Sequence, residues 1–165
     1  MDNKKYMRII KKHGEDILAS DGMKIEKTCI QHGIFSVYDH SLFVTRMCLH
    51  LADIFSIRVD TRALVRGALL HDYFLYDWHI PSKVKNTHGF THPNTAFRNA
   101  SRDFKLGIIE SNMIRRHMFP LTPIPPKYRE SVLLCIADKI CAGYETIDGF
   151  KRRFIKRFRR LDTNA

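Results

Sequence analysis

The stretch Gly67-Ala68-Leu69-Leu70-His71-Asp72-Tyr73-Phe74 begins as an apolar helical run and then places an imidazole directly beside a carboxylate. Both groups are common ligands of divalent cations at hydrolytic sites. A single His-Asp pair is weak evidence, because such pairs occur by chance in many chains. The pair gains weight from single histidines and an aspartate on other amphipathic segments, which can converge only in a helical fold that points them inward. These residues are His40, His92, His117 and Asp138.

The length and composition of the chain indicate one ordinary globular domain. With 165 residues, of which 44% are hydrophobic, the chain is long enough for one sizeable core and short for two. No apolar run approaches the roughly 18–20 residues of a membrane span, and the N-terminus lacks the apolar region of a signal peptide. The four cysteines show no CxxC spacing, which favours thiols in a reducing compartment. We therefore expect a cytoplasmic protein.

The formal net charge of +11 is concentrated at the C-terminus. The segment 151–160 alone carries seven basic residues and no acidic one, and without it the net charge is about +4. A strongly basic chain normally points to nucleic acid or an anionic surface as a partner. Here that inference applies to the tail rather than to the whole domain.

Hydrophobic periodicity predicts three long helices in the first half of the chain. The first covers 4–18, with Gly14 as an interruption, and a loop at 21–22 with a short helix follows, for which Gly33 is the expected stop. The second covers 37–55, with Ser36 as its N-cap and Asp39 completing an approximate capping box. The third starts at Asp60 and runs through the His-Asp pair, and Gly67 within it permits a close approach by a neighbouring segment.

Three more helices are predicted in the second half. One starts at 91–93, where a proline suits the first helical position. One covers 106–117, with Ile108 among its inward-facing residues, and the last covers 128–144. Four of the six prolines lie between 120 and 126 and exclude regular structure there. No segment shows a convincing strand pattern.

The sequence therefore predicts an all-α, single-domain helical bundle. We expect an N-terminal helical extension over 1–33, a core with the candidate site over 34–146, and a basic amphipathic tail over 147–165.

The order and context of these residues resemble the HD-domain superfamily of metal-dependent phosphohydrolases, whose signature is H…HD…D on a core of helices. The matching segments are Tyr38-Asp39-His40-Ser41, Ala68-Leu69-Leu70-His71-Asp72 and Ile136-Ala137-Asp138-Lys139, and the likeness covers roughly residues 34–146. His92 and His117 are similar to the additional histidines of the binuclear members, such as symmetrical dinucleoside-tetraphosphate hydrolases and cyclic-dinucleotide phosphodiesterases. The resemblance implies a hydrolase of phosphate esters or anhydrides acting on a nucleotide or other small phosphorylated metabolite.

Two departures from the family pattern leave the substrate open. Many relatives carry a lysine three residues after the HD aspartate, where this chain has Leu75. The GYP tripeptide that marks one cyclic-dinucleotide subgroup is absent, which disfavours that substrate class.

The resemblance gives each candidate ligand a role. Asp72 has two oxygens and could bridge two cations, drawn from Mn, Fe, Co, Ni and Mg. His40, His71 and Asp138 would complete one cation site, while His92 and His117 would serve the second. Two such cations lower the pKa of bound water toward roughly 7 and hold the phosphoryl oxygens of an in-line displacement.

Residues beside these ligands supply candidates for substrate contact. Lys139 and Arg116 are suited by charge to bind phosphate. His88 and His79 lie in the crossover between helices and could protonate a leaving alkoxide, although both are more commonly ordinary loop residues. His92 can alternatively be a helix cap, and His117 a surface residue favoured by the helix dipole.

The tail allows two interpretations. Phe150, Phe154, Phe158 and Leu161 recur at helical spacing, with basic residues between them. Such a helix can contact an anionic membrane or nucleic acid, or it can dock its apolar side on its own domain, and we favour docking. The rival to an enzyme is accordingly a non-catalytic, metal-bound regulatory module that contacts nucleic acid or an anionic membrane through this tail.

Overall fold

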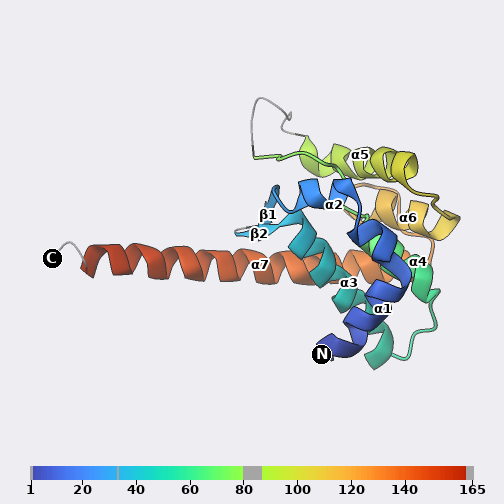
Figure 1. The fold of residues 1–165 in the computed structure, drawn as a ribbon, viewed down its shortest axis with the longest axis horizontal. Coiled ribbons are helices and arrows are strands. Elements are labelled where there is room, and N and C mark those ends of the chain that lie inside the picture. Colours follow the sequence, from blue (N-terminus) through green and yellow to red (C-terminus); the bar gives the residue numbers. More distant parts are fainter. Residues whose placement is uncertain (1, 33, 80–86, 163–165) are drawn as a thin grey trace.

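The described residues form helices and a small hairpin, and one long helix, α7, packs its N-terminal part against several of the others (Figure 1). The structure is a computed structural model that describes residues 2–32, 34–79 and 87–162, with side chains described only as far as residue 149 and not for His32. The elements in chain order are α1 (Asn3–Leu18), α2 (Asp21–Glu26), β1 (Ile30–His32), β2 (Phe35–Ser36), α3 (Val37–Ile54), α4 (Thr61–Leu69), α5 (His88–Asp103), α6 (Ile108–Arg116) and α7 (Arg129–Asp162). The predicted all-α class is confirmed.

The predicted helix caps are confirmed at α3 and α4. Ser36 Oγ accepts the backbone N–H of Asp39 at 3.1 Å and donates to the Asp39 carboxylate at 2.6 Å. Asp60 accepts the backbone N–H of Ala63 at 2.9 Å. Each cap satisfies donors that the first helical turn leaves without a backbone partner. In α1, the backbone of Gly14 departs from helical geometry, as its predicted interruption requires.

Two predicted helix boundaries are wrong, and both affect the candidate site. Helix α4 ends at Leu69 with Leu70 as its C-cap, so His71 and Asp72 lie just beyond the helix rather than in it. Helix α5 begins at His88 instead of near residue 91, so Pro93 lies inside the helix. Proline is tolerated there because only one backbone hydrogen bond of the opening turns is lost.

The segment between α1 and α3 also differs from the prediction. Asp21 and Gly22 are helical rather than a loop, because Ser20 caps α2 by accepting the N–H of Met23. Strands β1 and β2 pair antiparallel, with Ile30 opposite Ser36. Strands of three and two residues are too short to show an alternating pattern in the sequence. The predicted stop at residue 33 lies outside the described residues.

One hydrophobic core unites the N-terminal helix with the rest of the fold. Ile10 and Ile17 of α1 are completely buried in the same cluster as Leu64 and Leu69 of α4 and Leu134 of α7. Helix α1 therefore contributes side chains to the main core. Helix α6 buries Met113 and Ile114 as predicted, but Ile108 is 74% exposed because it begins the helix and points away from the core.

Helix α7 is twice as long as predicted, because no proline interrupts the chain after residue 126. It crosses the expected boundary at 146–147 without a break, and Figure 1 shows its C-terminal part extending away from the other elements. The backbone thus does not fold back as docking of the tail requires, and that prediction is wrong for the backbone of α7. The side chains of Phe150, Phe154, Phe158 and Leu161 lie outside the described residues. Within the described part of the chain, no helix combines the length and apolarity needed to cross a membrane.

We predict that Gly22→Ala destabilises the protein by about 1–3 kcal/mol, because its new methyl group would overlap the buried phenol ring of Tyr73, the residue after Asp72. Gly143→Ala is the matched control: it lies in α7 with open space around it, and alanine there should stabilise by about 0.4–1 kcal/mol. Urea unfolding of both variants measures whether each substitution lowers or raises the free energy of unfolding. Equal stability of wild type and Gly22→Ala contradicts this packing of α2 against Tyr73.

Candidate metal centre

Six side chains from five segments converge at the centre of the helical fold. His40 comes from α3, the pair His71-Asp72 follows α4, His92 belongs to α5, His117 caps the end of α6, and Asp138 lies in α7. None is more than 9% exposed. Their burial requires the packing of all these helices, so the cluster is a product of the tertiary fold.

Asp72 occupies the middle of the cluster and faces two sets of imidazoles. Its Oδ1 atom lies 3.2 Å from His92 Nε2 and 3.5 Å from His117 Nε2. Its Oδ2 atom lies 3.5 Å from His71 Nε2 and 3.9 Å from His40 Nε2. Each oxygen thus belongs to a separate group of three residues with the spacing of a cation site.

Asp138 joins the group on the Oδ2 side. Its Oδ1 atom lies 3.1 Å from His40 Nε2 and 3.7 Å from His71 Nε2. Burial opposes ionisation of Asp138, but hydrogen bonds with His40 and His71 outweigh it and hold the pKa of this carboxyl far below its usual range. Burial likewise opposes ionisation of Asp72, and the neighbouring His71 and His92 hold its pKa well below the usual value.

Backbone carbonyls orient three of the four histidines. The Nδ1 atom of His71 lies 2.8 Å from the Ala68 carbonyl oxygen, that of His92 lies 2.9 Å from the His88 carbonyl oxygen, and that of His117 lies 2.8 Å from the Ile114 carbonyl oxygen. A carbonyl oxygen only accepts, so each Nδ1 must carry the proton. In the neutral imidazole each Nε2 then presents a lone pair to the centre, which is the arrangement that metal-ligating histidines adopt.

His40 is oriented differently, by a carboxylate. Its Nδ1 atom lies 2.8 Å from Oε2 of Glu145, and both side chains are completely buried. Burial disfavours the protonated imidazole, but hydrogen bonds with Asp138 and Glu145 raise the pKa of His40 to about 10. A proton on Nε2 therefore occupies the position that a cation would take, and cation binding must displace it.

Several atoms of the cluster are buried hydrogen-bond acceptors that no donor of the described residues reaches. His92 Nε2 and His117 Nε2 lie 2.8 Å apart. Burial and nearby His92 lower the pKa of His117 to about 3, which keeps this imidazole neutral. Among the described residues, His71 Nε2 and Asp72 Oδ1 are buried without any hydrogen-bond donor. Bare acceptors crowded together in a buried site are costly unless positive charge lies between them, so these residues fit a bound divalent cation.

Two polar side chains beside the cluster are absent from the predicted site. Gln31 of β1 donates its amide to Asp72 Oδ2 at 2.5 Å and accepts from the Trp78 indole at 3.2 Å. Glu26 of α2 is completely buried, and burial together with the nearby Asp72 raises the pKa of its carboxyl well above the usual value. Neither residue belongs to a recognisable local motif. Glu145 carries a weak signal in the sequence, because it lies seven residues after Asp138 on the same helical face.

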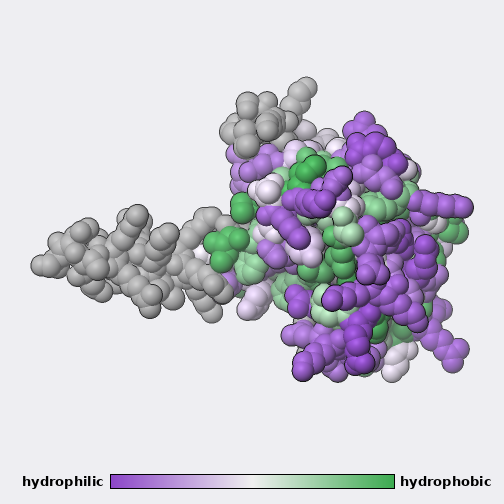
Figure 2. Space-filling model, in the orientation of Figure 1, coloured by the Kyte–Doolittle hydropathy of each residue, from purple (hydrophilic) through white to green (hydrophobic). Residues whose placement is uncertain are grey.

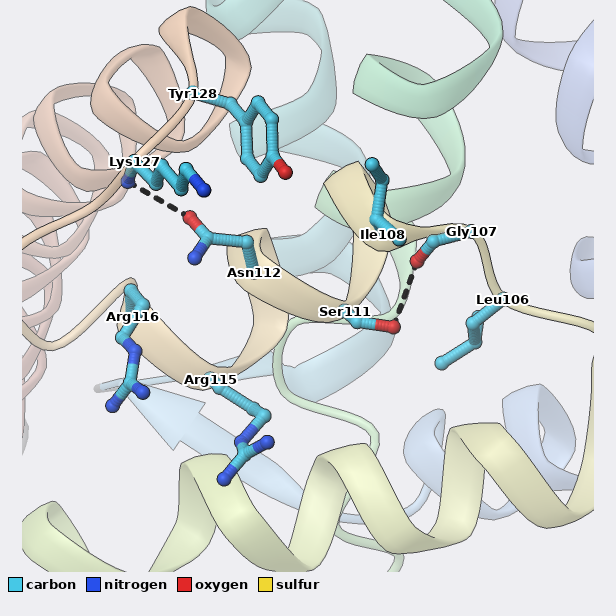
Figure 3. Close-up of a pocket in the computed structure, with 9 residues that line it drawn as sticks. All are labelled: Leu106, Gly107, Ile108, Ser111, Asn112, Arg115, Arg116, Lys127 and Tyr128. Atoms are coloured by element: carbon cyan, nitrogen blue, oxygen red, sulfur yellow. Dashed lines mark hydrogen bonds between the residues drawn. The ribbon is translucent and has the colours of Figure 1, made fainter.

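Lys139 and Arg116 do not contact the cluster through their charged groups in the described structure. The Lys139 ammonium donates to the backbone carbonyls of His117 and Cys135, both at 3.2 Å, and thereby ties α7 to the end of α6. Arg116 lines a separate cavity of about 370 Å³ with Arg115, Asn112 and Lys127, whose arrangement Figure 3 shows. The Lys127 backbone N–H donates to the Asn112 side chain at 3.0 Å across this cavity.

His88 lies beside the cluster rather than in it. Its ring stacks on Trp78 with centroids 5.0 Å apart and on His92 at 4.7 Å, and its Nδ1 lies 3.0 Å from the Tyr76 hydroxyl. Burial, followed by the proximity of His92, lowers the pKa of His88 to about 4. A neutral imidazole at ordinary pH is poorly suited to the predicted role of proton donor. His79 lies farther out, against Asp77 and Trp78.

The carboxylate behind His40 leads to a prediction about cation affinity. Glu145→Gln keeps an oxygen that can accept the Nδ1 proton of His40 but removes the negative charge, and such outer carboxylates typically contribute about 10–100-fold to metal affinity. We therefore expect Mn²⁺ to bind this variant about tenfold more weakly, as measured by calorimetric titration.

Glu130→Gln is the matched control, because Glu130 is a buried carboxylate on the same helix that accepts the Asp60 backbone N–H at 2.8 Å, away from the cluster. It should bind Mn²⁺ as wild type does. A Glu145→Gln variant that is folded and binds with undiminished affinity refutes the orienting role of Glu145.

Comparison with known proteins agrees with this geometry. No curated protein and no solved structure matches the chain. The family model of the HD domain matches residues 37–143, well over half of the chain, and this range contains all six residues of the cluster. Metal-dependent phosphohydrolase activity is the general function that such a match indicates. The buried His/Asp cluster and the match across the helical core together show that the chain belongs to the HD domain family.

Proposed function

We propose that the protein is a phosphohydrolase that uses two divalent cations bridged by Asp72. The observation that carries this proposal is the division of the Asp72 carboxylate, whose two oxygens face different imidazole pairs at 3.2–3.9 Å. His40, His71 and Asp138 would hold one cation with Oδ2, and His92 and His117 the other with Oδ1. A single-cation site would leave one of these groups of acceptors without positive charge.

The charge of the cluster also supports two cations. Three carboxylates, those of Asp72, Asp138 and Glu145, lie in contact with the four imidazoles. A protonated His40 compensates only part of this buried negative charge, and no Lys or Arg side chain of the described residues forms an ion pair with these carboxylates. When bound, two divalent cations would supply an activated water as nucleophile and neutralise the phosphoryl oxygens.

Other groups of the chain would orient the ligands of the two cations. The backbone carbonyls behind His71, His92 and His117 fix the direction of each Nε2 lone pair. Gln31 holds Asp72 in place through its amide. The candidate cations are Mn, Fe, Co, Ni and Mg, all of which accept imidazole and carboxylate ligands to differing degrees.

The proposed substrate is a nucleotide or another small phosphorylated metabolite. The support is chemical: a divalent centre attracts phosphate oxygens, and the surface beside α6 carries Arg115, Arg116 and Lys127 around one cavity. Guanidinium groups bind phosphate through paired hydrogen bonds. Arg116 remains our candidate for binding a distal phosphate, whereas Lys139 is assigned to holding His117 in position.

Hydrolysis assays test this function directly. We expect the purified protein to release phosphate or nucleoside monophosphate from at least one member of a panel of phosphomonoesters, nucleotides and dinucleoside polyphosphates when one of the candidate cations is added. Asp72→Ala should reduce this activity to background, because both groups of ligands lose a shared carboxylate. Asp72→Asn should retain the fold with a crippled centre.

Asp21→Asn is the control, since Asp21 is an exposed carboxylate on α2 that pairs only with Lys24 at the surface. Wild-type activity is expected for it. Absence of turnover with every cation, together with tight RNA binding that depends on the tail, would favour the non-catalytic regulatory module instead.

A further inference from the structure

Helix α7 exposes a row of large apolar side chains on the side that faces away from the core. Leu134, Ala137 and Cys141 on its inner side are completely buried. Its outer side carries five residues that are 43–59% exposed, which we call the outer stripe: Val132, Ile136, Ile140, Tyr144 and Ile147. A contiguous apolar row of this size on a surface helix commonly marks a binding surface.

The outer stripe is a continuous feature of one helical face. Its members are separated by four, four, four and three residues, so at about 100° per residue they stay within one sector of the helix. Figure 2 shows hydrophobic surface at the position where α7 leaves the rest of the fold, and hydrophilic residues over much of the remaining face in this view. The exposed row therefore begins on the domain and is directed along the projecting helix.

Four of the five large apolar residues in the tail sequence continue the spacing of the outer stripe. After Ile147, four large apolar residues of the tail follow at intervals of three, four, four and three: Phe150, Phe154, Phe158 and Leu161. Ile155 falls outside this spacing. Because the helix is continuous from Arg129 to Asp162, this spacing keeps the same phase as the outer stripe. The sequence pattern of the outer stripe thus continues into the tail, and the backbone of α7 extends away from the other elements (Figure 1).

The charge of the tail selects the kind of partner. The segment 151–160 contains seven basic residues and no acidic one. Seven cations favour an anionic partner and disfavour a second copy of the same helix laid alongside in parallel. The phosphates of nucleic acid would pair with the basic side chains of the tail. They would not bury the isoleucines and phenylalanines of the apolar row, however.

We propose that the outer stripe and the basic tail together bind the surface of an anionic lipid bilayer. The apolar row would enter the boundary between headgroups and acyl chains, while the lysines and arginines would remain among the anionic headgroups. Helix α7 would then lie along the membrane and hold the HD domain beside it. This inference is independent of the proposed hydrolase activity.

Vesicle flotation of the full chain tests this inference. We expect the protein to float with vesicles of phosphatidylcholine containing about one-third phosphatidylserine, and to bind vesicles of pure phosphatidylcholine at least about tenfold more weakly. Raising the salt concentration should weaken binding to the anionic vesicles. Equal binding to both kinds of vesicle, or no binding to either, overturns the proposal.

Substitutions on the domain separate the stripe from general basicity. Ile140→Gln/Ile147→Gln changes two partly exposed residues and leaves the basic residues of the tail in place, so it should reduce vesicle binding about tenfold without affecting thermal unfolding by more than a few degrees. Ile108→Gln is the matched control, because Ile108 is 74% exposed on α6, outside the stripe, and should bind as wild type does.

Two other occupants would be revealed by the same variants. If Ile140→Gln/Ile147→Gln converts a dimer into a monomer in light scattering while vesicle binding is unchanged, the stripe binds a second copy and the lipid proposal fails. If single-stranded RNA displaces the protein from vesicles and binds the wild type and this variant equally, the tail serves nucleic acid and the proposal likewise fails.

Discussion

The central constraint on this structure is the sharing of one buried carboxylate between two groups of lone pairs. Asp72 is 2% exposed, and each of its oxygens faces imidazole nitrogens on a different side. The carbonyls behind His71, His92 and His117 fix the direction from which each Nε2 atom faces the carboxylate. A cluster built from acceptors in a dry interior is unfavourable by itself, and the fold must be stable enough to hold it until cations bind.

The helical fold meets this constraint by fixing each ligand at a helix end or on a buried helix face. His71 and Asp72 lie just after α4, where the chain leaves helical geometry and Tyr73 is anchored in the core against Gly22. His117 ends α6, and Lys139 of α7 binds its carbonyl. Because the ligands come from different helix ends and faces, side chains from several helices can meet at one point in the core. The continuous core from α1 to α7 provides the stability that the polar centre requires.

The sequence singled out the six residues that the fold brings together and predicted most of the helices that carry them, because the order of His and Asp residues resembles a known family and helix caps have local signatures. Their role as metal ligands remains a prediction. Ser36 and Asp60 illustrate this, since each is a capping residue directly before an apolar periodic segment. Gln31 could not be predicted, because it reaches Asp72 from a hairpin too short to show a pattern. Glu145 shares a helical face with Asp138, but spacing alone does not distinguish a buried carboxylate from an exposed one. The sequence also could not show whether the tail folds back on the domain or continues away from it. That depends on how α7 packs against the core, which only the structure shows.

The proposed two-cation centre is tested most directly by the metal content of the purified protein after saturation with Mn²⁺ and removal of unbound ions. The wild-type chain is expected to retain about two ions, and the variant His92→Ala/His117→Ala about one, since only the group around Asp72 Oδ2 remains. His13→Ala/His79→Ala removes two histidines outside the cluster and should leave the ratio at about two. The same number of ions in wild type and in His92→Ala/His117→Ala would contradict the division of Asp72 between two cations.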